Sequence, residues 1–207
     1  MVLKIATGDF KGMTLASSSS AKELRPTQAL VREAIINTLG SMFLSREQAF
    51  EDLNVLDLYS GSGSMGFEFL SNGVAAISFV ERDPKCKSLL RRNSEKMKTD
   101  SQVKIVSGAL PKILKSTQFS RESFDLVFFD PPFKFTIDEF LATVKAVLEQ
   151  ELLKSGALLI LEYRDMGLAK ALEQQFPEDL VLLKTKKYGG CIVIFAEKKT
   201  SCKTKFC

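Results

Sequence analysis

The chain has 207 residues, 45% of them hydrophobic and 26% charged, which is ordinary for a globular protein with one well-packed domain and an appendage. Histidine is absent and the four cysteines form no CxxC pair, which excludes Ser-His-Asp and Cys-His hydrolases and argues against a zinc site or a disulfide framework. The sequence contains no apolar run of about 18 residues, so we predict no membrane span. The first five residues lack the apolar core of a secretory signal. We therefore expect a cytoplasmic protein without metal or membrane contacts.

The first 48 residues predict an N-terminal arm and a capping helix. A short hairpin is expected around Gly8 to Gly12, and the serine run at 17–20 predicts a loop. Thr27 fits the N-cap of a helix. Apolar residues then recur at helical spacing over 28–43, so we expect an amphipathic helix there.

From Leu53 onward, strand patterns alternate with helix patterns. The predicted strands cover 53–59, 77–81, 103–107, 124–130 and 157–162, followed by two β-rich runs at 180–186 and 191–197. The predicted helices cover 64–72, 84–98, 109–117, 136–150 and 166–175. Alternating units of this kind imply a mostly parallel sheet with helices on both faces.

The last two runs are joined by Tyr188-Gly189-Gly190, which predicts a terminal antiparallel hairpin. A sheet of seven strands ending in such a hairpin is the arrangement of Rossmann-like class I methyltransferases. We place this α/β domain at 49–199 and a basic tail at 200–207. From Leu180 to Cys207 there are seven lysines and one glutamate, so this end of the chain has a net charge of about +6. Such a charge favours a polyanionic partner; the alternative interpretation is a solvated terminal tail.

A glycine-rich turn follows the first predicted strand. The Gly61-x-Gly63-x-x-Gly66 spacing matches the dinucleotide fingerprint, because it follows a strand and opens a helix. Glu81 ends the second strand twenty positions after Gly61, where an acid binds a ribose diol. The turn alone therefore fits both a dinucleotide enzyme and an S-adenosylmethionine enzyme.

Asp57, near the end of the first strand, favours the second of these. Its carboxylate would repel a pyrophosphate placed against the following helix N-terminus. S-adenosylmethionine has no phosphate and carries an ammonium and a sulfonium, both of which a carboxylate attracts. The competing interpretation is an aspartate that only caps a turn.

A second motif, Asp130-Pro131-Pro132-Phe133, follows a nearly continuous apolar run at 124–129. Proline cannot donate to a sheet ladder, so the strand must stop at Asp130. The Asp130 carboxylate, the exposed carbonyls and the Phe133 ring would then form an acceptor patch at the carboxyl edge of the sheet, where ligands bind. Such a patch suits a planar group that bears an amine, although a plain turn after a strand has a similar composition.

These motifs resemble the amino-methyltransferases that act on exocyclic nitrogens of bases. More narrowly, the chain from about Ile5 to Glu197 resembles the bacterial 16S rRNA guanine-N2 methyltransferases of the RsmD type. The segments that carry this closer resemblance are Leu24-Arg25-Pro26-Thr27, Val31-Arg32-Glu33, the turn from Asp57 to Gly66 and Lys187-Tyr188-Gly189.

The resemblance also implies roles for individual residues. The catalytic motif would be Asp130, Pro131, Pro132 and Phe133. The cofactor would be held by Asp57, Tyr59, Ser60, Gly61, Gly63, Gly66, Glu81, Arg82 and the Ala109 position. The substrate would meet Arg25, Thr27, Arg32, Lys134 and Tyr188. One departure concerns the position after the third strand, where relatives usually carry an Asp or Asn that contacts the adenine and this chain has Ala109. Either Ser107 or a backbone amide replaces that contact, or the affinity for S-adenosylmethionine is weaker.

The implied function is methylation of a guanine N2 amine in 16S rRNA, free or in the assembling small subunit, by a monomer that uses S-adenosylmethionine. Asp130 and the Pro131 carbonyl would accept the two amine hydrogens, the base would stack on Phe133, and the nitrogen would attack the methyl group in line. Alternatives are an adenine-N6 or cytosine-N4 methyltransferase on DNA or another RNA, a dinucleotide-dependent oxidoreductase, and a non-catalytic RNA-binding module.

Overall fold

The structure is a computed structural model that describes residues 3–17, 29–120, 122–132, 135–163, 172, 174–188 and 190–200. Its seven strands form one α/β sheet in the order β3-β2-β1-β4-β5-β7-β6, parallel except for its C-terminal antiparallel strands. The predicted fold class is therefore confirmed. The chain divides into two compact units, Met1–Ile113 and Leu114–Cys207.

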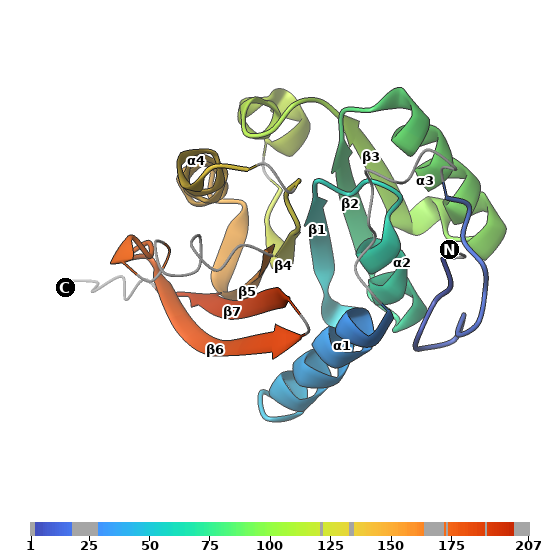
Figure 1. Cartoon of the computed structure of the whole chain (residues 1–207), viewed down its shortest axis with the longest axis horizontal. Helices are drawn as coiled ribbons and strands as arrows, with labels where there is room; N and C mark the ends of the chain where they lie inside the picture. Colours follow the sequence, from blue (N-terminus) through green and yellow to red (C-terminus); the bar gives the residue numbers. More distant parts are fainter. Residues whose placement is uncertain are drawn as a thin grey trace, which may run out of the picture. The chain divides into compact units, whose positions relative to one another are not determined.

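The first unit contains three parallel strands and three helices (Figure 1). In chain order its elements are α1 (Ala29–Leu44), β1 (Asn54–Leu58), α2 (Ser64–Ser71), β2 (Ala76–Glu81), α3 (Pro84–Met97) and β3 (Val103–Ser107). α2 packs against β1 and β2, α3 packs against β3, and α1 packs against α2. All eight residues of α2 are buried, which explains why its sequence is almost continuously apolar or small.

Glu68 of α2 ties the N-terminal hairpin and α1 to this unit. The hairpin forms around the predicted glycines, with an antiparallel bridge between Lys4 and Thr14. The fully buried Glu68 carboxylate accepts hydrogen bonds from the amides of Ala6 and Thr7 and from Arg32 Nε at 3.0 Å. The predicted arm is thereby fixed to the core by a buried charge.

Helix α3 begins and ends with clear local signals. The Asp83 side chain accepts a hydrogen bond from the Lys85 amide, Pro84 follows at the first position, and Lys98 closes the helix in the left-handed conformation. Leu90 and Met97 are buried, while most of the basic residues stay exposed. The helix therefore has one face in the core and one charged face.

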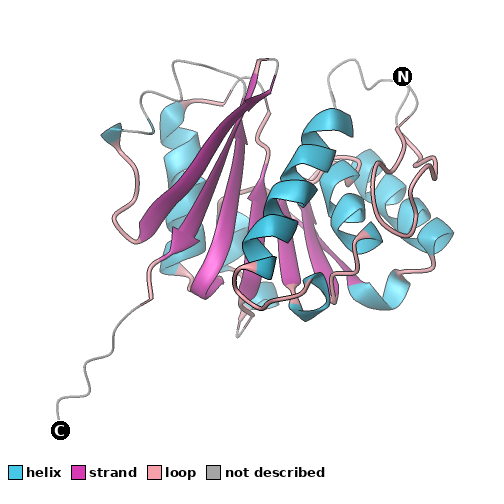
Figure 2. Cartoon of the chain, turned by 90° about the horizontal axis from the view of Figure 1, so that it is seen from below, coloured by secondary structure: helices cyan, strands magenta, loops and turns pink. Residues whose placement is uncertain are grey.

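The second unit contains β4 (Phe124–Phe129), α4 (Ile137–Glu149), β5 (Leu153–Tyr163), β6 (Leu180–Tyr188) and β7 (Cys191–Lys198), shown in Figures 1 and 2. β4 pairs with β5 in parallel, and β7 lies antiparallel between β5 and β6. Thr136 and Glu139 form a capping box that starts α4. The predicted terminal hairpin is confirmed by the pairing of Tyr188 with Cys191.

Two predicted elements differ from the structure. The helix expected at 109–117 is wrong, since only two short 3₁₀ turns form, at Lys112–Lys115 and Thr117–Phe119. Pro111 has no amide hydrogen to donate and disfavours the helical conformation of Leu110, so a regular α-helix cannot run through the predicted stretch. β5 begins four residues before its predicted start, because Gly156, with φ of 76°, is accommodated within the strand. The expected Thr27 cap and most of the helix at 166–175 lie outside the described residues.

The buried pair Arg32–Glu68 and the exposed pair Lys154–Asp125 allow a direct comparison of ion pairs. Their N–O distances are 3.0 Å and 2.8 Å, but the side chains of the first pair are only 3% and 0% exposed, against 41% and 15% for the second. We predict that Arg32→Met lowers the free energy of unfolding by about 3–5 kcal/mol, because it leaves a buried charge without its cation. Lys154→Met should cost about 0–1 kcal/mol. Urea unfolding measures both.

The double variant Arg32→Met/Glu68→Gln tests the physical reason. A glutamine oxygen still accepts the amides of Ala6 and Thr7, while no charge remains buried, so the double variant should be more stable than Arg32→Met alone. A double variant no more stable than the single one would contradict the proposed role of the charge.

Candidate functional site

The turn between β1 and α2 has a fixed and unusual backbone. Tyr59, Gly61 and Gly63 have φ of 60°, 54° and 78°, so three residues of this turn adopt the left-handed conformation. A side chain at Gly63 would clash with Leu90 and with the Phe67 ring, in addition to the strain at its φ. Gly63 also serves as the N-cap of α2. The turn therefore presents backbone, with little side-chain bulk, at the start of the helix.

Ser60 fixes this turn to the two strands beneath it. Its hydroxyl donates to the Asp57 carbonyl at 2.7 Å, and its amide donates to the Val80 carbonyl at 3.2 Å. The Ser60 side chain is nearly buried. The residue predicted to contact a cofactor thus also holds the shape of the turn.

Gly66 allows α2 to lie close to β2. A Cβ at this position would overlap the ring of Phe79 and the side chain of Ile77. The Gly66 amide also donates to the Asp57 carboxyl group. Close helix–strand packing is the role expected for the third glycine of this spacing.

Glu81 ends β2, as predicted, and its carboxylate joins two loops. One oxygen accepts the Gly61 amide at 2.8 Å, and the other accepts the Asp83 amide at 2.8 Å. Glu81 is half-buried and follows Val80, which pairs with Leu58 at the end of β1. A second carboxylate is therefore held at the edge of the glycine turn.

Asp57 gives the turn its electrostatic character. The side chain is buried, and burial raises its pKa well above the usual value; the Gly66 hydrogen bond lowers the pKa, and the Glu81 charge raises it again. Among the described residues, neither carboxylate forms an ion pair with a basic side chain. The turn is therefore suited to a ligand that brings positive charge and unsuited to a pyrophosphate.

The end of β3 lies beside Glu81, because Ser107 pairs with Glu81 in register. Lys87 Nζ donates to the Ser107 hydroxyl at 2.5 Å. Ala109, two residues further, is exposed and offers only backbone groups, and its carbonyl accepts the Ile113 amide at 3.0 Å. Arg82 is also exposed. Ser107 thus has the only side-chain hydroxyl of the 106–110 stretch, and its role as a substitute for the missing Asp or Asn stays a prediction.

The second unit contains the acceptor motif. β4 ends at Phe129, one residue before the predicted limit, and Asp130 follows it outside the ladder. Asp130 and Pro131 are half-buried, Pro132 is exposed, and the Pro132 carbonyl accepts the Phe135 amide at 3.1 Å in a turn toward α4. Phe133 and Lys134 lie outside the described residues.

The predicted substrate residues have different outcomes. Arg25 and Thr27 lie outside the described residues, and Tyr188 is half-buried at the end of β6. Arg32 was predicted to lie near the substrate, but its guanidinium is buried against Glu68 and also donates to the Lys4 carbonyl at 2.5 Å. The structure therefore gives Arg32 a structural role in place of a surface one, since a buried charge requires its partner.

Asn93 is a site-supporting residue that sequence analysis missed. It is fully buried in α3; its oxygen accepts the Ala16 amide at 2.7 Å, and its nitrogen donates to the carbonyls of Ala16 at 3.1 Å and of Ser62 at 3.4 Å. It thus connects the N-terminal arm to the glycine turn. One feature of the sequence could have identified Asn93: its amide side chain comes three residues after Leu90, on the apolar face of the predicted helix, where a buried polar group requires hydrogen-bond partners.

Within the described residues, no cluster of acidic or cysteine side chains is suited to hold a metal ion. None of the described helices is long and apolar enough to cross a membrane.

Comparison with known proteins identifies the family of this chain. The family model described as Conserved hypothetical protein 95 matches residues 3–197. The chain is 32% identical over 189 residues to ribosomal RNA small subunit methyltransferase D of Haemophilus influenzae, covering 90% of this chain and 89% of that protein. It is 26% identical over 185 residues to the protein of the same name from Buchnera aphidicola subsp. Baizongia pistaciae, covering 89% and 86%.

A hypothetical protein from Thermus thermophilus has the same fold, with a TM-score of 0.72 at 22% identity over 94% of this chain and 98% of that one. The resemblance to the RsmD-type proteins is thus confirmed over nearly the full length of both sequences. The chain belongs to the Conserved hypothetical protein 95 family, which includes these RsmD-type proteins.

Proposed function

We propose that this protein transfers the methyl group of S-adenosylmethionine to the N2 amine of a guanine in small-subunit (16S) rRNA. The carrying observation is the glycine turn, where buried Asp57 and half-buried Glu81 form no ion pair with a described cation. The names of the related proteins support rRNA of the small subunit as substrate. Ribosomal RNA as substrate is consistent with the cytoplasmic location predicted from the sequence, and a monomer stays our expectation.

The residues of the first unit fit this cofactor by their chemistry. S-adenosylmethionine, when bound, supplies an electrophilic methyl group on a positively charged sulfur. Asp57 would attract the positive charges of its amino acid part, and the Glu81 carboxylate would accept the ribose hydroxyls. Gly61 and Gly63 leave room for close approach to the backbone. A nicotinamide dinucleotide would instead place phosphates near the Asp57 charge, which disfavours the oxidoreductase alternative.

The acceptor motif of the second unit would prepare the amine. The guanine N2 lone pair is delocalised into the ring, which makes the nitrogen a poor nucleophile. The Asp130 carboxylate and the Pro131 carbonyl would accept its two hydrogens and localise the lone pair, and Asp130 or water would take up the released proton. From the sequence we assign Phe133 to stacking on the base, which requires the base to leave its helix.

Labelled S-adenosylmethionine tests the proposal directly. Incubation with small ribosomal subunits, free 16S rRNA and DNA should label the subunits or the rRNA, and nuclease digestion should yield N2-methylguanosine. Label in DNA, or in adenine or cytosine, would select the alternative base methyltransferases. Absence of any transfer, together with binding of nicotinamide dinucleotides, would select the oxidoreductase.

Asp130→Asn should lower the methylation rate by about 10²–10⁴-fold, because a neutral amide is a weaker acceptor and cannot take a proton. Asp125→Asn provides the matched control, since Asp125 lies on β4, the strand that Asp130 follows, and pairs with Lys154 at 2.8 Å. Radiometric transfer to rRNA measures both rates, while calorimetry should show unchanged cofactor binding. Near wild-type turnover in Asp130→Asn would remove Asp130 from the mechanism.

Asp57→Asn should weaken binding of S-adenosylmethionine at least about tenfold, because a charge-assisted contact in a buried site is lost. Isothermal titration calorimetry with S-adenosylmethionine measures the change. Unaltered affinity would show that Asp57 serves only the turn.

The same variant should be more stable than the wild type in the absence of cofactor. Because burial raises the pKa of Asp57 in the folded chain, its contribution to stability is full below the unfolded value of about 3.8 and is lost as pH rises through the folded pKa. Asp57→Asn removes this loss while keeping an acceptor for the Gly66 amide. Its advantage in urea midpoint should grow from pH 4 to pH 7; a constant difference would contradict the raised pKa.

A further inference from the structure

Positive charge is concentrated on α3 and β3, at the edge of the sheet. Residues 82–104 contain eight lysines and arginines against three aspartates and glutamates, a net charge of +5, whereas the whole chain carries +4. The cations are Arg82, Lys85, Lys87, Arg91, Arg92, Lys96, Lys98 and Lys104. Residues 82–104 are therefore more basic than the rest of the chain.

Two of the acids in this stretch are occupied by local structure. Asp83 accepts the Lys85 amide at the start of α3, and Asp100 accepts the Ser94 hydroxyl at 3.1 Å. No ion pair within the described part of the chain involves Lys85, Arg91 or Arg92. Local acids therefore do not neutralise these cations through ion pairs.

The helix places part of this charge in a line. Lys85, Arg92 and Lys96 are seven and four residues apart, so they fall on one stripe of a helix with about 3.6 residues per turn. All three are exposed. Lys96 Nζ donates to the Thr14 carbonyl at 2.6 Å, so the stripe continues to the N-terminal hairpin.

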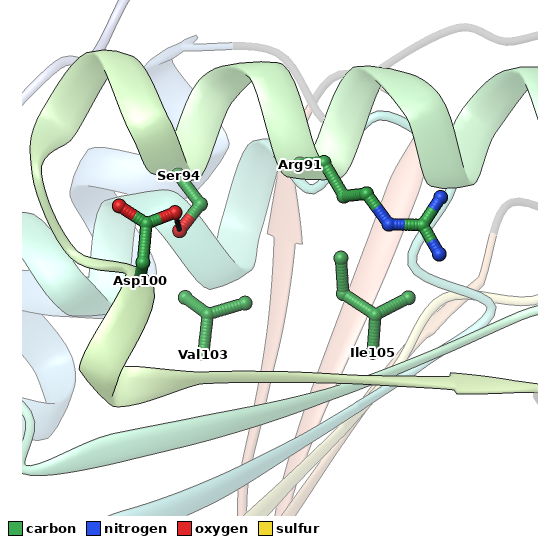
Figure 3. A pocket seen from close by; sticks show the side chains of 5 residues that line it. All are labelled: Arg91, Ser94, Asp100, Val103 and Ile105. Carbon is green, nitrogen blue, oxygen red and sulfur yellow. Dashed lines mark hydrogen bonds between the residues drawn. The ribbon is translucent and has the colours of Figure 1, made fainter.

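Beside the stripe, a cavity of about 280 Å³ opens between α3 and β3, lined by Arg91, Ser94, Asp100, Val103 and Ile105. Figure 3 shows the Arg91 side chain extended along α3, with its guanidinium directed away from the Asp100 carboxylate. Val103 and Ile105 come from the edge strand and form the apolar floor. A guanidinium is thus exposed at the rim of a recess, although a carboxylate lines the same recess.

We propose that the α3–β3 face is a docking surface for the RNA backbone, in which Lys85, Arg91 and Arg92 contact phosphates. The inference rests on the proposed function, which makes RNA the substrate, and adds a surface on α3 and β3 to the residues already assigned. Several exposed cations without acidic partners are the complement of a phosphate chain, and each guanidinium can bind a phosphate through two donors. Such contacts fix the position of the RNA without reading its sequence.

The test is the triple variant Lys85→Gln/Arg91→Gln/Arg92→Gln, titrated with a 16S rRNA fragment by fluorescence anisotropy over a salt series. The slope of log affinity against log salt concentration should become shallower by about two to three, because each lost phosphate contact removes about 0.7–0.9. The dissociation constant at physiological salt should rise at least about tenfold. Lys11→Gln/Lys112→Gln/Lys145→Gln, which removes three exposed cations outside this face, should change both quantities far less.

Calorimetry with S-adenosylmethionine should give the wild-type affinity for both triple variants, which shows that they are folded. An unchanged salt slope in the α3 variant, or equal losses in the two variants, would overturn the docking surface while methylation by the wild type leaves the proposed function intact. If the wild-type protein neither binds nor methylates rRNA, the proposed function and this inference both fail.

Discussion

The structure of the first unit depends on burying carboxylates at the loops around α2. Asp57 and Glu68 are buried and Glu81 half-buried, and each is held by backbone amides: Gly66 for Asp57, Ala6 and Thr7 for Glu68, Gly61 and Asp83 for Glu81. The three carboxylates differ in whether a basic side chain pairs with them. Glu68 has Arg32, whereas Asp57 and Glu81 form no ion pair with a described residue. The fold thus neutralises the Glu68 charge internally, and we propose that a cationic ligand does the same for Asp57 and Glu81.

The missing cation at Asp57 would link the stability of the ligand-free protein to the binding of a ligand at the glycine turn. Burial without a cation raises the pKa of Asp57 and lowers the stability of the ligand-free protein at neutral pH. A cationic ligand that favours the ionised form would recover that stability on binding. The left-handed backbone of Tyr59, Gly61 and Gly63 would contribute in the same direction if a ligand binds this conformation, because less backbone ordering would then accompany binding.

Much of this organisation could be predicted from the sequence. The strands ending near Asp57, Glu81 and Asp130 were recognisable because buried parallel strands are short apolar runs followed by polar or turn residues. The roles of Arg32 and Asn93 could not be predicted, because their partners are 36 and 77 positions away in the chain. The missing helix after β3 has a different cause: its apolar spacing was helical, but Pro111 interrupts the stretch.

Helix α3 joins the glycine turn to the basic surface proposed to dock RNA. Its inner face supplies Leu90 against Gly63 and Asn93 against Ser62, so this face shapes the glycine turn. Its outer face carries Arg91 and Arg92. Because its inner face is packed, the backbone of α3 is held in place, so only the outer side chains would need ordering when they meet a polyanion. The same packing that shapes the glycine turn would therefore orient the surface that we propose to dock RNA.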